Sequence, residues 1–330
     1  MSGFSTIGVM GAGAWGTALA NAAARAGRKV TLWTRDPDHA GDMVASRENT
    51  RRLPGVKLEA AILPTADLAL CAKSDAILLV TPAQTARQMA EALAIVLRPG
   101  VPVVLCAKGI DRVSGQFLGD IVGDALPRQP VAMLSGPSFA ADVARGLPTA
   151  VSLACKDAVI AEALALSLSS PSFRLYHGTD LRGVEIGGAA KNVLAIACGI
   201  VIGKGLGESA RAALVARGFA ELMRFAGGYG GKPATLMGLS GLGDLVLTCG
   251  SAQSRNFSFG LALGQGQSLF DASGGMLVEG ALTAGVLLTL ARARGIDMPI
   301  VEQVAALVAE ETTINDAIQA LTTRPTRAEI

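Results

Sequence analysis

The chain has 330 residues, more than one ordinary hydrophobic core organises, so its length predicts two domains. Half of the residues are apolar but only 4% are aromatic, which favours closely packed helices over a broad aromatic binding face. The net charge is +2, with 29 basic and 27 acidic residues, and this balance excludes a sequence-wide field that would attract nucleic acid or an anionic membrane.

Two uncharged runs, at residues 192–203 and 280–291, contain only 12 residues each, so they predict buried helices rather than membrane spans. The five cysteines include no C-x-x-C pair, which favours free thiols in a reducing compartment over disulfides or zinc. The chain enters a strand pattern at Thr6 without a basic region and an apolar signal segment. We therefore expect a cytoplasmic protein that holds no metal and binds no membrane.

Residues 6–10 form a short apolar run, a glycine-rich turn follows at 11–16, and residues 17–26 are rich in helix formers. This order of strand, turn and helix predicts a dinucleotide site. Gly11 would make the tight turn, Gly13 would let the backbone approach a pyrophosphate, and Gly16 would let helix and strand pack closely. The alternative is a glycine-rich turn that binds no nucleotide.

The predicted second strand, at residues 30–33, ends in Thr34-Arg35-Asp36. An acidic side chain at this place usually binds the ribose hydroxyls of NAD, whereas an arginine accommodates the 2′-phosphate of NADP. Uncharged Thr34 takes the strand end and Arg35 follows it, so the sequence favours NADP(H), with NAD(H) also possible. Asp36 leaves both choices open, because it can cap the next helix or bind a ribose.

After a loop at residues 49–55, strands are predicted at 76–80 and 101–107, with a helix at 83–97 between them. Ligands of an open parallel sheet bind beyond the carboxyl ends of its strands, where Lys108 follows the second of these strands. A further strand at 131–134 leads into Ser135-Gly136-Pro137-Ser138, which suggests a phosphate-sized gap. The alternatives are a solvated loop lysine and an ordinary serine-proline turn.

Strands at residues 150–153 and 173–176 extend the predicted sheet, and beyond about 179 apolar residues recur at helical spacing as far as 321. We therefore predict an α/β fold: a Rossmann-type NAD(P)-binding domain at 1–180 and an all-helical substrate and catalytic domain at 181–330. Lys191 is the one cation in an otherwise uncharged run, and a buried ammonium is costly unless partners or function retain it. We expect this lysine at the cleft where the domains meet.

Polar groups also concentrate at residues 241–249 and 254–256. Asp244 can orient or charge-balance Lys191, and Arg255 suits bidentate binding of a phosphate. Taken singly, such residues are more often helix caps and surface pairs.

These motifs, in this order, resemble the bacterial NAD(P)-dependent sn-glycerol-3-phosphate dehydrogenases over nearly the whole chain. The resemblance implies reversible reduction of dihydroxyacetone phosphate to sn-glycerol 3-phosphate for glycerophospholipid synthesis, by a homodimer. The matching segments are residues 11–20, Asn49 with 53–55, 108–109, 135–140, 188–195, 241–245, Thr248, 254–256 and 279–280.

The resemblance also implies roles for single residues, with Lys191 as the catalytic acid and base beside Lys108 and Asp244. The implied substrate-binding residues are Lys108, Gly136, Ser138, Lys191, Asn192, Asp244, Thr248, Ser254, Arg255 and Asn256. The implied cofactor-binding residues are Gly11, Gly13, Ala14, Trp15, Gly16, Arg35, Lys108, Ala140, Arg255, Leu277 and Glu279.

The chemistry of the residues is consistent with these roles. Hydride delivery to a ketone builds negative charge on its oxygen, which a lysine can stabilise and protonate. In the reverse direction the lysine must lose its proton near neutrality, and burial or a second cation such as Lys108 favours that loss. We expect Lys191 to protonate the alkoxide, Lys108 to polarise the carbonyl, Asp244 to orient the lysine, and Arg255 with Asn256 to hold the phosphate.

Two other functions share parts of this pattern. A 2-oxo acid reductase of the ketopantoate type has the same architecture and also uses a lysine of the helical domain, but its carboxylate substrate needs no phosphate pocket. A noncatalytic NADPH sensor would keep the glycine turn without Lys108, Lys191 and Asp244.

The role expected for Arg35 leads to a first prediction. Arg35→Ala should lower kcat/KM for NADPH more than for NADH, because only NADPH carries the 2′-phosphate. Initial rates with both cofactors check this, and an equal loss for the two would contradict the assignment.

Overall fold

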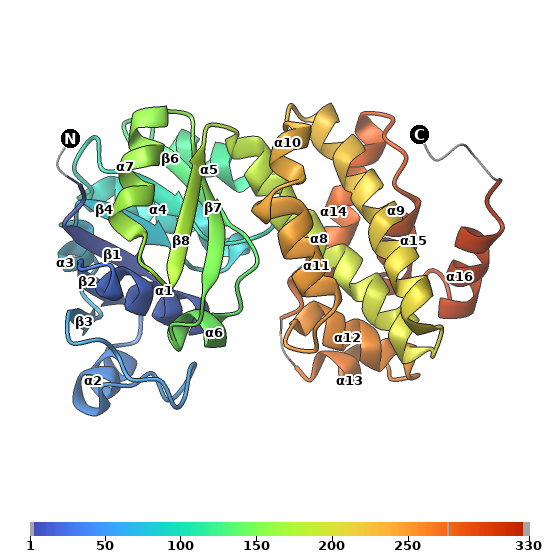
Figure 1. The fold of residues 1–330 in the computed structure, drawn as a ribbon, viewed down its shortest axis with the longest axis horizontal. Helices are drawn as coiled ribbons and strands as arrows, with labels where there is room; N and C mark the ends of the chain where they lie inside the picture. Colours follow the sequence, from blue (N-terminus) through green and yellow to red (C-terminus); the bar gives the residue numbers. More distant parts are fainter. Residues whose placement is uncertain (1–2, 276, 326–330) are drawn as a thin grey trace. The chain divides into compact units, whose positions relative to one another are not determined.

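The computed structural model describes residues 3–275 and 277–325, and the chain divides into two compact units (Figure 1). One unit holds the chain up to Gly188 together with Ala234–Asp244, and the other holds Ala189–Pro233 and the chain from Leu245 onward. By packing, the first unit therefore takes in the first eight residues of helix α8 (Leu181–Gly203), beyond the predicted boundary near 180.

An eight-stranded sheet forms the centre of the first unit, in the order β3-β2-β1-β4-β5-β6-β7-β8. Neighbouring strands are parallel except for β6 and β7, which are antiparallel. The order of the first six strands is that of the Rossmann fold, which confirms the predicted fold class. The strands are β1 (Thr6–Met10), β2 (Lys29–Trp33), β3 (Ile62–Thr65), β4 (Ala76–Leu79), β5 (Val103–Leu105), β6 (Val131–Ser135), β7 (Thr149–Cys155) and β8 (Phe173–Gly178).

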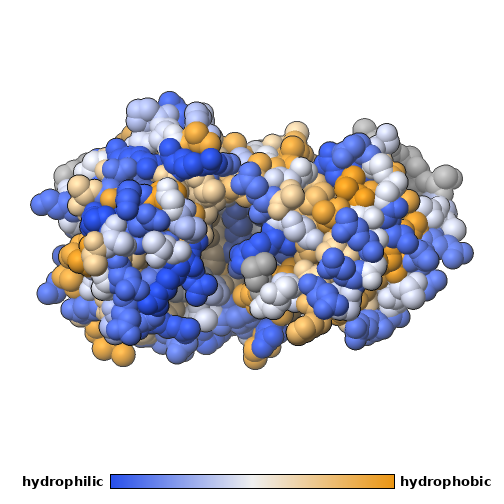
Figure 2. Space-filling model, turned by 90° about the horizontal axis from the view of Figure 1, so that it is seen from below, coloured by the Kyte–Doolittle hydropathy of each residue, from blue (hydrophilic) through white to orange (hydrophobic). Residues whose placement is uncertain are grey.

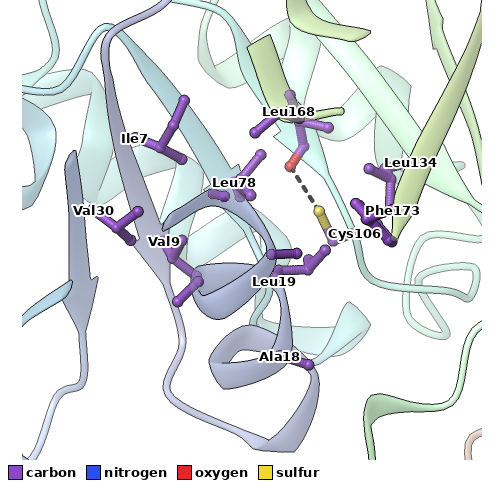
Figure 3. Close-up of a cluster of buried hydrophobic side chains, with 14 of the residues drawn as sticks. Ile7, Val9, Ala18, Leu19, Val30, Leu78, Cys106, Leu134, Leu168 and Phe173 are labelled. Atoms are coloured by element: carbon purple, nitrogen blue, oxygen red, sulfur yellow. Dashed lines mark hydrogen bonds between the residues drawn. The ribbon is translucent and has the colours of Figure 1, made fainter. Parts of the chain in front are cut away.

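Alternate residues of each strand point to opposite sides of the sheet, so apolar side chains emerge on both faces. Helices cover both of these faces. On one face Ile7 and Val9 pack with Leu19 of α1, in the cluster drawn in Figure 3. On the other face Met10 and Ile77 pack against a separate set of helices. The helices on the face of Ile7 and Val9 are α1 (Ala14–Arg25), α6 (Ala140–Ala144) and α7 (Ala158–Leu168). Those on the face of Met10 and Ile77 are α3 (Leu68–Ala72), α4 (Ala86–Val96) and α5 (Leu118–Ala125).

The edge strand β3 is absent from the sequence prediction because it contains Pro64, which argues against a central strand. As an edge strand β3 pairs only with β2, so the missing N–H of proline is tolerated there. Strand β5 is shorter than predicted, and Lys108 lies three residues beyond its end.

After Gly178 the described part of the chain contains no strand, as predicted. Besides α8, its elements are α9 (Gly207–Gly228), α10 (Pro233–Leu236), η2 (Leu239–Gly243), α11 (Asp244–Cys249), α12 (Arg255–Gly264), α13 (Leu269–Ser273), α14 (Glu279–Ala293), α15 (Pro299–Val308) and α16 (Ile314–Thr322).

Helix α8 is long and apolar enough to cross a membrane by length and composition alone, but 89% of its most apolar window is buried inside the protein. Burial of this kind is that of a core helix, as the sequence predicted for residues 192–203. The other run, at 280–291, lies in α14, which buries one face only. Figure 2 shows hydrophilic residues interspersed with scattered apolar ones on the face that it displays.

Two buried glutamates cap helices other than their own. Glu185 of α8 accepts a hydrogen bond from the Gly119 N–H at the start of α5 (2.7 Å). Glu221 of α9 accepts from the Ile300 and Val301 N–H groups at the start of α15 (2.8 and 3.3 Å). Neither α5 nor α15 has a side-chain cap at its own N-cap residue, so these carboxylates satisfy N–H groups that would otherwise be buried without a partner.

Burial raises the pKa of both carboxyls to about 7, against the opposing effect of the N–H groups and of Arg182 or Arg224. A carboxyl whose pKa is raised in the folded state binds its proton more tightly there. Its contribution to stability is therefore complete below pH 4.5 and is lost as the pH rises to about 7.

We accordingly expect Glu221→Gln to reduce the dependence of stability on pH. Between pH 5 and pH 8 the parent should lose about 2 kcal/mol more than the variant, because only the parent ionises at this site. Thermal unfolding midpoints at several pH values check this. Parallel pH profiles for the two proteins would contradict it.

Candidate active site

The glycine turn between β1 and α1 has the shape that a pyrophosphate requires. Gly11 has φ of 117°, and its N–H donates to the Trp33 carbonyl at 3.0 Å, which ties the end of β2 to the turn. A Cβ at Gly16 would lie 1.8 Å from the Gly11 oxygen, whereas one at Gly13 would meet nothing within 4 Å. Gly13 at the N-cap provides no side chain to cap α1, and the space beside it is open. The turn thus fits a dinucleotide phosphate.

Ala14 and Trp15 are the first residues of α1. Both are partly buried and pack against the same core cluster as Ala140, the first residue of α6. Since α1 and α6 also pack together, the structure brings these predicted cofactor residues to one side of the sheet.

At the end of β2, Thr34 is buried and Arg35 is exposed. The Asp36 carboxylate caps α2 (Pro37–Ser46) by accepting from the Asp38 and His39 N–H groups. Of the two roles that the sequence left open for Asp36, the structure therefore shows the helix cap.

Lys108 lies beyond the carboxyl end of β5 and is paired with Asp244 in the same unit. Its Nζ is 2.7 Å from an Asp244 carboxylate oxygen and also donates to the Gly136 carbonyl at 3.4 Å. The Asp244 side chain is only 1% exposed and that of Lys108 is 16% exposed, so the pair is largely desolvated. The lysine is therefore not the solvated loop residue of the alternative interpretation.

The backbone turns sharply after β6. Gly136 has φ of 154°, and a Cβ there would lie 2.8 Å from the Val151 Cα, so the turn needs a glycine. The Ser138 hydroxyl donates to the Gly136 carbonyl at 3.0 Å. The Gly136 carbonyl oxygen thus accepts hydrogen bonds from the side chains of Lys108 and Ser138. All three are predicted substrate residues.

Two buried hydroxyls at this edge of the sheet have no hydrogen-bond partner among the described residues: Ser135 Oγ, at the end of β6, and Thr81 Oγ1, just after β4. Buried polar groups are normally satisfied, so unpaired ones at the carboxyl ends of parallel strands mark a place for a ligand. The sequence placed Ser135 in a predicted phosphate-sized gap but gave Thr81 no ligand role. Only its position after a predicted strand could have indicated one.

The start of α8 closes against this edge. A Cβ at Gly188 would lie 2.7 Å from Ser135 Oγ and 3.3 Å from Lys108 Cγ. A Cβ at Gly187 would lie 2.5 Å from the carbonyl oxygen of Ser240 in η2. Gly187 therefore lets the backbone of η2 approach closely, and Gly188 leaves room for the side chains of Ser135 and Lys108.

In the second unit Lys191 is buried, at 6% exposure, and its Nζ donates to the Thr248 hydroxyl at 2.8 Å. The neighbouring Asn192 is also buried. Hydrogen bonding to Cys198 and burial raise the pKa of the Cys249 thiol, while Lys191 acts in the opposite direction. The ammonium therefore lies near the Thr248 hydroxyl and the Cys249 thiol, on a helix whose other buried residues are mostly apolar.

Helix α12 carries the other predicted polar group. Ser254 is its N-cap and accepts from the Phe257 N–H at 3.3 Å, and Arg255 at its first position is exposed. The buried Asn256 accepts from the Gly280 N–H at 2.8 Å, which joins α12 to the start of α14. Glu279 is the first residue of α14, and Leu277, two residues before it, is 47% exposed.

Within residues 3–275 and 277–325, no three His, Cys, Asp or Glu side chains are grouped so that they could hold a metal ion. All five cysteines are buried and free.

Comparison with known proteins gives matches along nearly the whole chain. Residues 6–161 match the family model described as NAD-dependent glycerol-3-phosphate dehydrogenase N-terminus, and residues 180–319 match the C-terminus model of the same name. Glycerol-3-phosphate dehydrogenase [NAD(P)+] of Methylobacterium radiotolerans is 61% identical over 100% of this chain and 99% of its own. That of Azorhizobium caulinodans is 58% identical, with 100% of both chains covered.

Solved structures agree with these matches. The crystal structure of glycerol-3-phosphate dehydrogenase from Coxiella burnetii is 39% identical, covers 97% of this chain and 99% of its own, and superposes with a TM-score of 0.92. A ketopantoate reductase from Ralstonia eutropha is 17% identical, covers 96% of this chain and 99% of its own with a TM-score of 0.56, and shares the fold alone.

The contact between Gly187 and Ser240 yields a prediction. Gly187→Ala should destabilise the protein by about 1–3 kcal/mol, because its methyl group meets backbone that must move. Activity should fall as well, because η2 leads directly into Asp244.

Gly41→Ala is the matched control, since a Cβ at this helical, exposed site meets nothing within 4 Å. It should leave activity unchanged and raise stability by about 0.5–1 kcal/mol. Unfolding midpoints and initial rates give both values. A Gly187→Ala protein as stable as the parent would show that the close approach does not constrain the fold.

Proposed function

The chain belongs to the family of NAD-dependent glycerol-3-phosphate dehydrogenases, and we propose that it interconverts dihydroxyacetone phosphate and sn-glycerol 3-phosphate with NADP(H) or NAD(H). The observation that carries this proposal is the desolvated pair of Lys108 and Asp244 at the carboxyl edge of the parallel sheet. It stands beside two unpartnered hydroxyls, where ligands of this fold bind. The product would supply glycerophospholipid synthesis.

Lys191 would provide the proton. Its Nζ donates to the Thr248 hydroxyl at 2.8 Å, which holds the ammonium in place. In the reducing direction the ammonium would donate a proton to the alkoxide oxygen, and in the oxidising direction the neutral amine would accept one from the hydroxyl.

Lys108 would stabilise the negative charge that develops on the carbonyl oxygen. Its two contacts, the Asp244 carboxylate and the Gly136 carbonyl, fix the ammonium in one place before the substrate binds. Asp244 therefore supports Lys108 directly. Removing Asp244 would take away the carboxylate that balances the largely buried ammonium of Lys108, so the site should be sensitive to substitution of Asp244.

The substrate phosphate would be held by Arg255 and Asn256. Arg255 is exposed at the first position of α12, where N–H groups and the helix dipole favour an anion. Asn256 uses its side-chain oxygen for Gly280, so its amide N–H groups remain suited to a phosphate oxygen. Ser254 caps this helix terminus. The further predicted substrate residues are Asn192, Ser138 and Gly136.

The nicotinamide cofactor supplies or accepts the hydride when it is bound. Gly11, Gly13 and Gly16 provide the turn for its pyrophosphate, with Ala14 and Trp15 on the helix that follows. Arg35 is exposed at the end of β2 and would receive a 2′-phosphate, which is the basis for preferring NADP(H). The other proposed cofactor residues are Lys108, Ala140, Arg255, Leu277 and Glu279.

The proposal also includes the division of labour between residues 1–180, which would bind the cofactor, and residues 181–330, which would bind the substrate. We further propose a cytoplasmic homodimer. Five buried free thiols are consistent with a reducing compartment, and the alanine- and glycine-rich helices with close packing across a dimer.

The proposal predicts that Lys191→Ala lowers turnover by about 100- to 10,000-fold while NADPH binding is retained, because the lysine serves proton transfer and not cofactor binding. NADPH oxidation is followed with dihydroxyacetone phosphate, with ketopantoate, and with no substrate. Lys204→Ala, at an exposed lysine just after α8, is the control and should keep parental rates.

Turnover of Lys191→Ala near the parental level would remove this lysine from the mechanism. A parent that oxidises NADPH with ketopantoate rather than with dihydroxyacetone phosphate would favour the 2-oxo acid reductase.

A further inference from the structure

The loop after α2 is fastened to the dinucleotide turn by one fully buried side chain. Asn49 donates to the Ala12 carbonyl at 2.9 Å and to the Thr17 hydroxyl at 2.7 Å. Its oxygen pairs with His39 Nε2 at 2.8 Å. The residues that follow Asn49 are therefore held in a fixed place beside the turn.

Two residues further on, Arg51 bridges two carboxylates. Its Nη1 is 2.8 Å from Asp36 Oδ2 and its Nη2 is 2.6 Å from Asp42 Oδ2. The guanidinium thus connects the loop to the N-cap residue and to the second turn of α2.

The bridge leaves both Asp36 oxygens occupied. Oδ1 accepts from the Asp38 and His39 N–H groups at 3.0 and 3.2 Å, and Oδ2 accepts from Arg51. The His39 N–H and the nearby Arg51 lower the pKa of Asp36, so it is an anion at neutral pH. A free carboxylate at this place would attract ribose hydroxyls and repel a 2′-phosphate.

Arg35, immediately before Asp36, is exposed and makes no hydrogen bond or ion pair with the described residues. The Gly11 N–H to Trp33 carbonyl bond holds this end of β2 at the dinucleotide turn. The adenosine end of a bound dinucleotide would therefore meet an available cation and a carboxylate whose two oxygens are both occupied and whose charge Arg51 partly offsets.

We propose that Arg51 is a specificity-determining residue, which favours NADP(H) over NAD(H) by occupying the Asp36 carboxylate and offsetting part of its charge. Arg51 acts through Asp36 and not as a direct ligand of the 2′-phosphate. This inference rests on the proposed use of a nicotinamide dinucleotide, and it adds to the expected role of Arg35.

A double-mutant cycle tests this indirect action. Dissociation constants for NADPH and NADH are measured by calorimetry, without substrate, for the parent, Arg51→Ala, Asp36→Asn and the double variant. Asparagine caps helices as well as aspartate does, so Asp36→Asn keeps α2 intact. The ratio of the two constants is the readout, which does not depend on turnover.

We expect Arg51→Ala to weaken NADPH binding relative to NADH by roughly fivefold, the size of effect that an exposed ion pair supports. In the Asp36→Asn background the same change should shift the ratio by less than about twofold, because no carboxylate charge is left to be offset. Asp42→Asn is the control and should leave the ratio unchanged, since the Arg51 contact to Asp36 remains.

An equal shift of the ratio in both backgrounds would mean that Arg51 binds the 2′-phosphate itself, which would overturn the proposal. Equal weakening of both cofactors by Arg51→Ala would reduce its role to support of the loop and would also overturn it. The proposed reaction fails separately, if the parent binds both cofactors but does not oxidise NADPH with dihydroxyacetone phosphate.

Discussion

The close approach of α8 to the turn that precedes Asp244 is the constraint on which the carboxyl edge of the sheet depends. Gly187 lies so near the Ser240 carbonyl that a methyl group has no room, and Gly188 lies against Ser135 and the stem of Lys108. Because these helix residues have no side chains, three segments far apart in the sequence meet at one edge of the sheet. Only then can Asp244 reach Lys108, which is 136 positions away in the chain.

Buried charges in this protein are joined to backbone groups as well as to other charges. Glu185 and Glu221 each complete the N-terminus of a helix that has no cap of its own, and Lys108 donates both to Asp244 and to a carbonyl. A buried ion that also satisfies backbone groups avoids two desolvation costs at once. Loss of such a side chain leaves unsatisfied polar groups on two different elements. These contacts therefore help to determine how the helices and strands pack together.

Much of the fold could be predicted because its signals are local. The strand, glycine turn and helix at residues 6–26 follow from periodicity and composition, and the change to helices after Gly178 follows from the loss of strand patterns. The strand β3 could not be predicted, since Pro64 is acceptable only at a sheet edge, and a single segment does not reveal which strand is at the edge.

The site residues divide in the same way. Lys108 was found from its place after a predicted strand, and Lys191 because a lone cation in an apolar run is unusual. The sequence placed Asp244 in the helical half and assigned it to Lys191, so its ion pair with Lys108, which lies in the same unit by packing, was not predicted. The sequence indicated a phosphate gap at Ser135 but no role for Thr81, and it could not show that either hydroxyl is buried without a partner, because that is a property of the packed structure.

The end of β2 shows why charge pattern alone is a poor guide to cofactor choice. The sequence Thr34-Arg35-Asp36 presents a cation and an anion side by side, and each points to a different dinucleotide. In the structure, Asp36 is taken up by contacts that lie outside this tripeptide, from two N–H groups of α2 and from the guanidinium of Arg51. What a ligand meets is the charge that remains after internal pairing, and here that charge is the cation of Arg35.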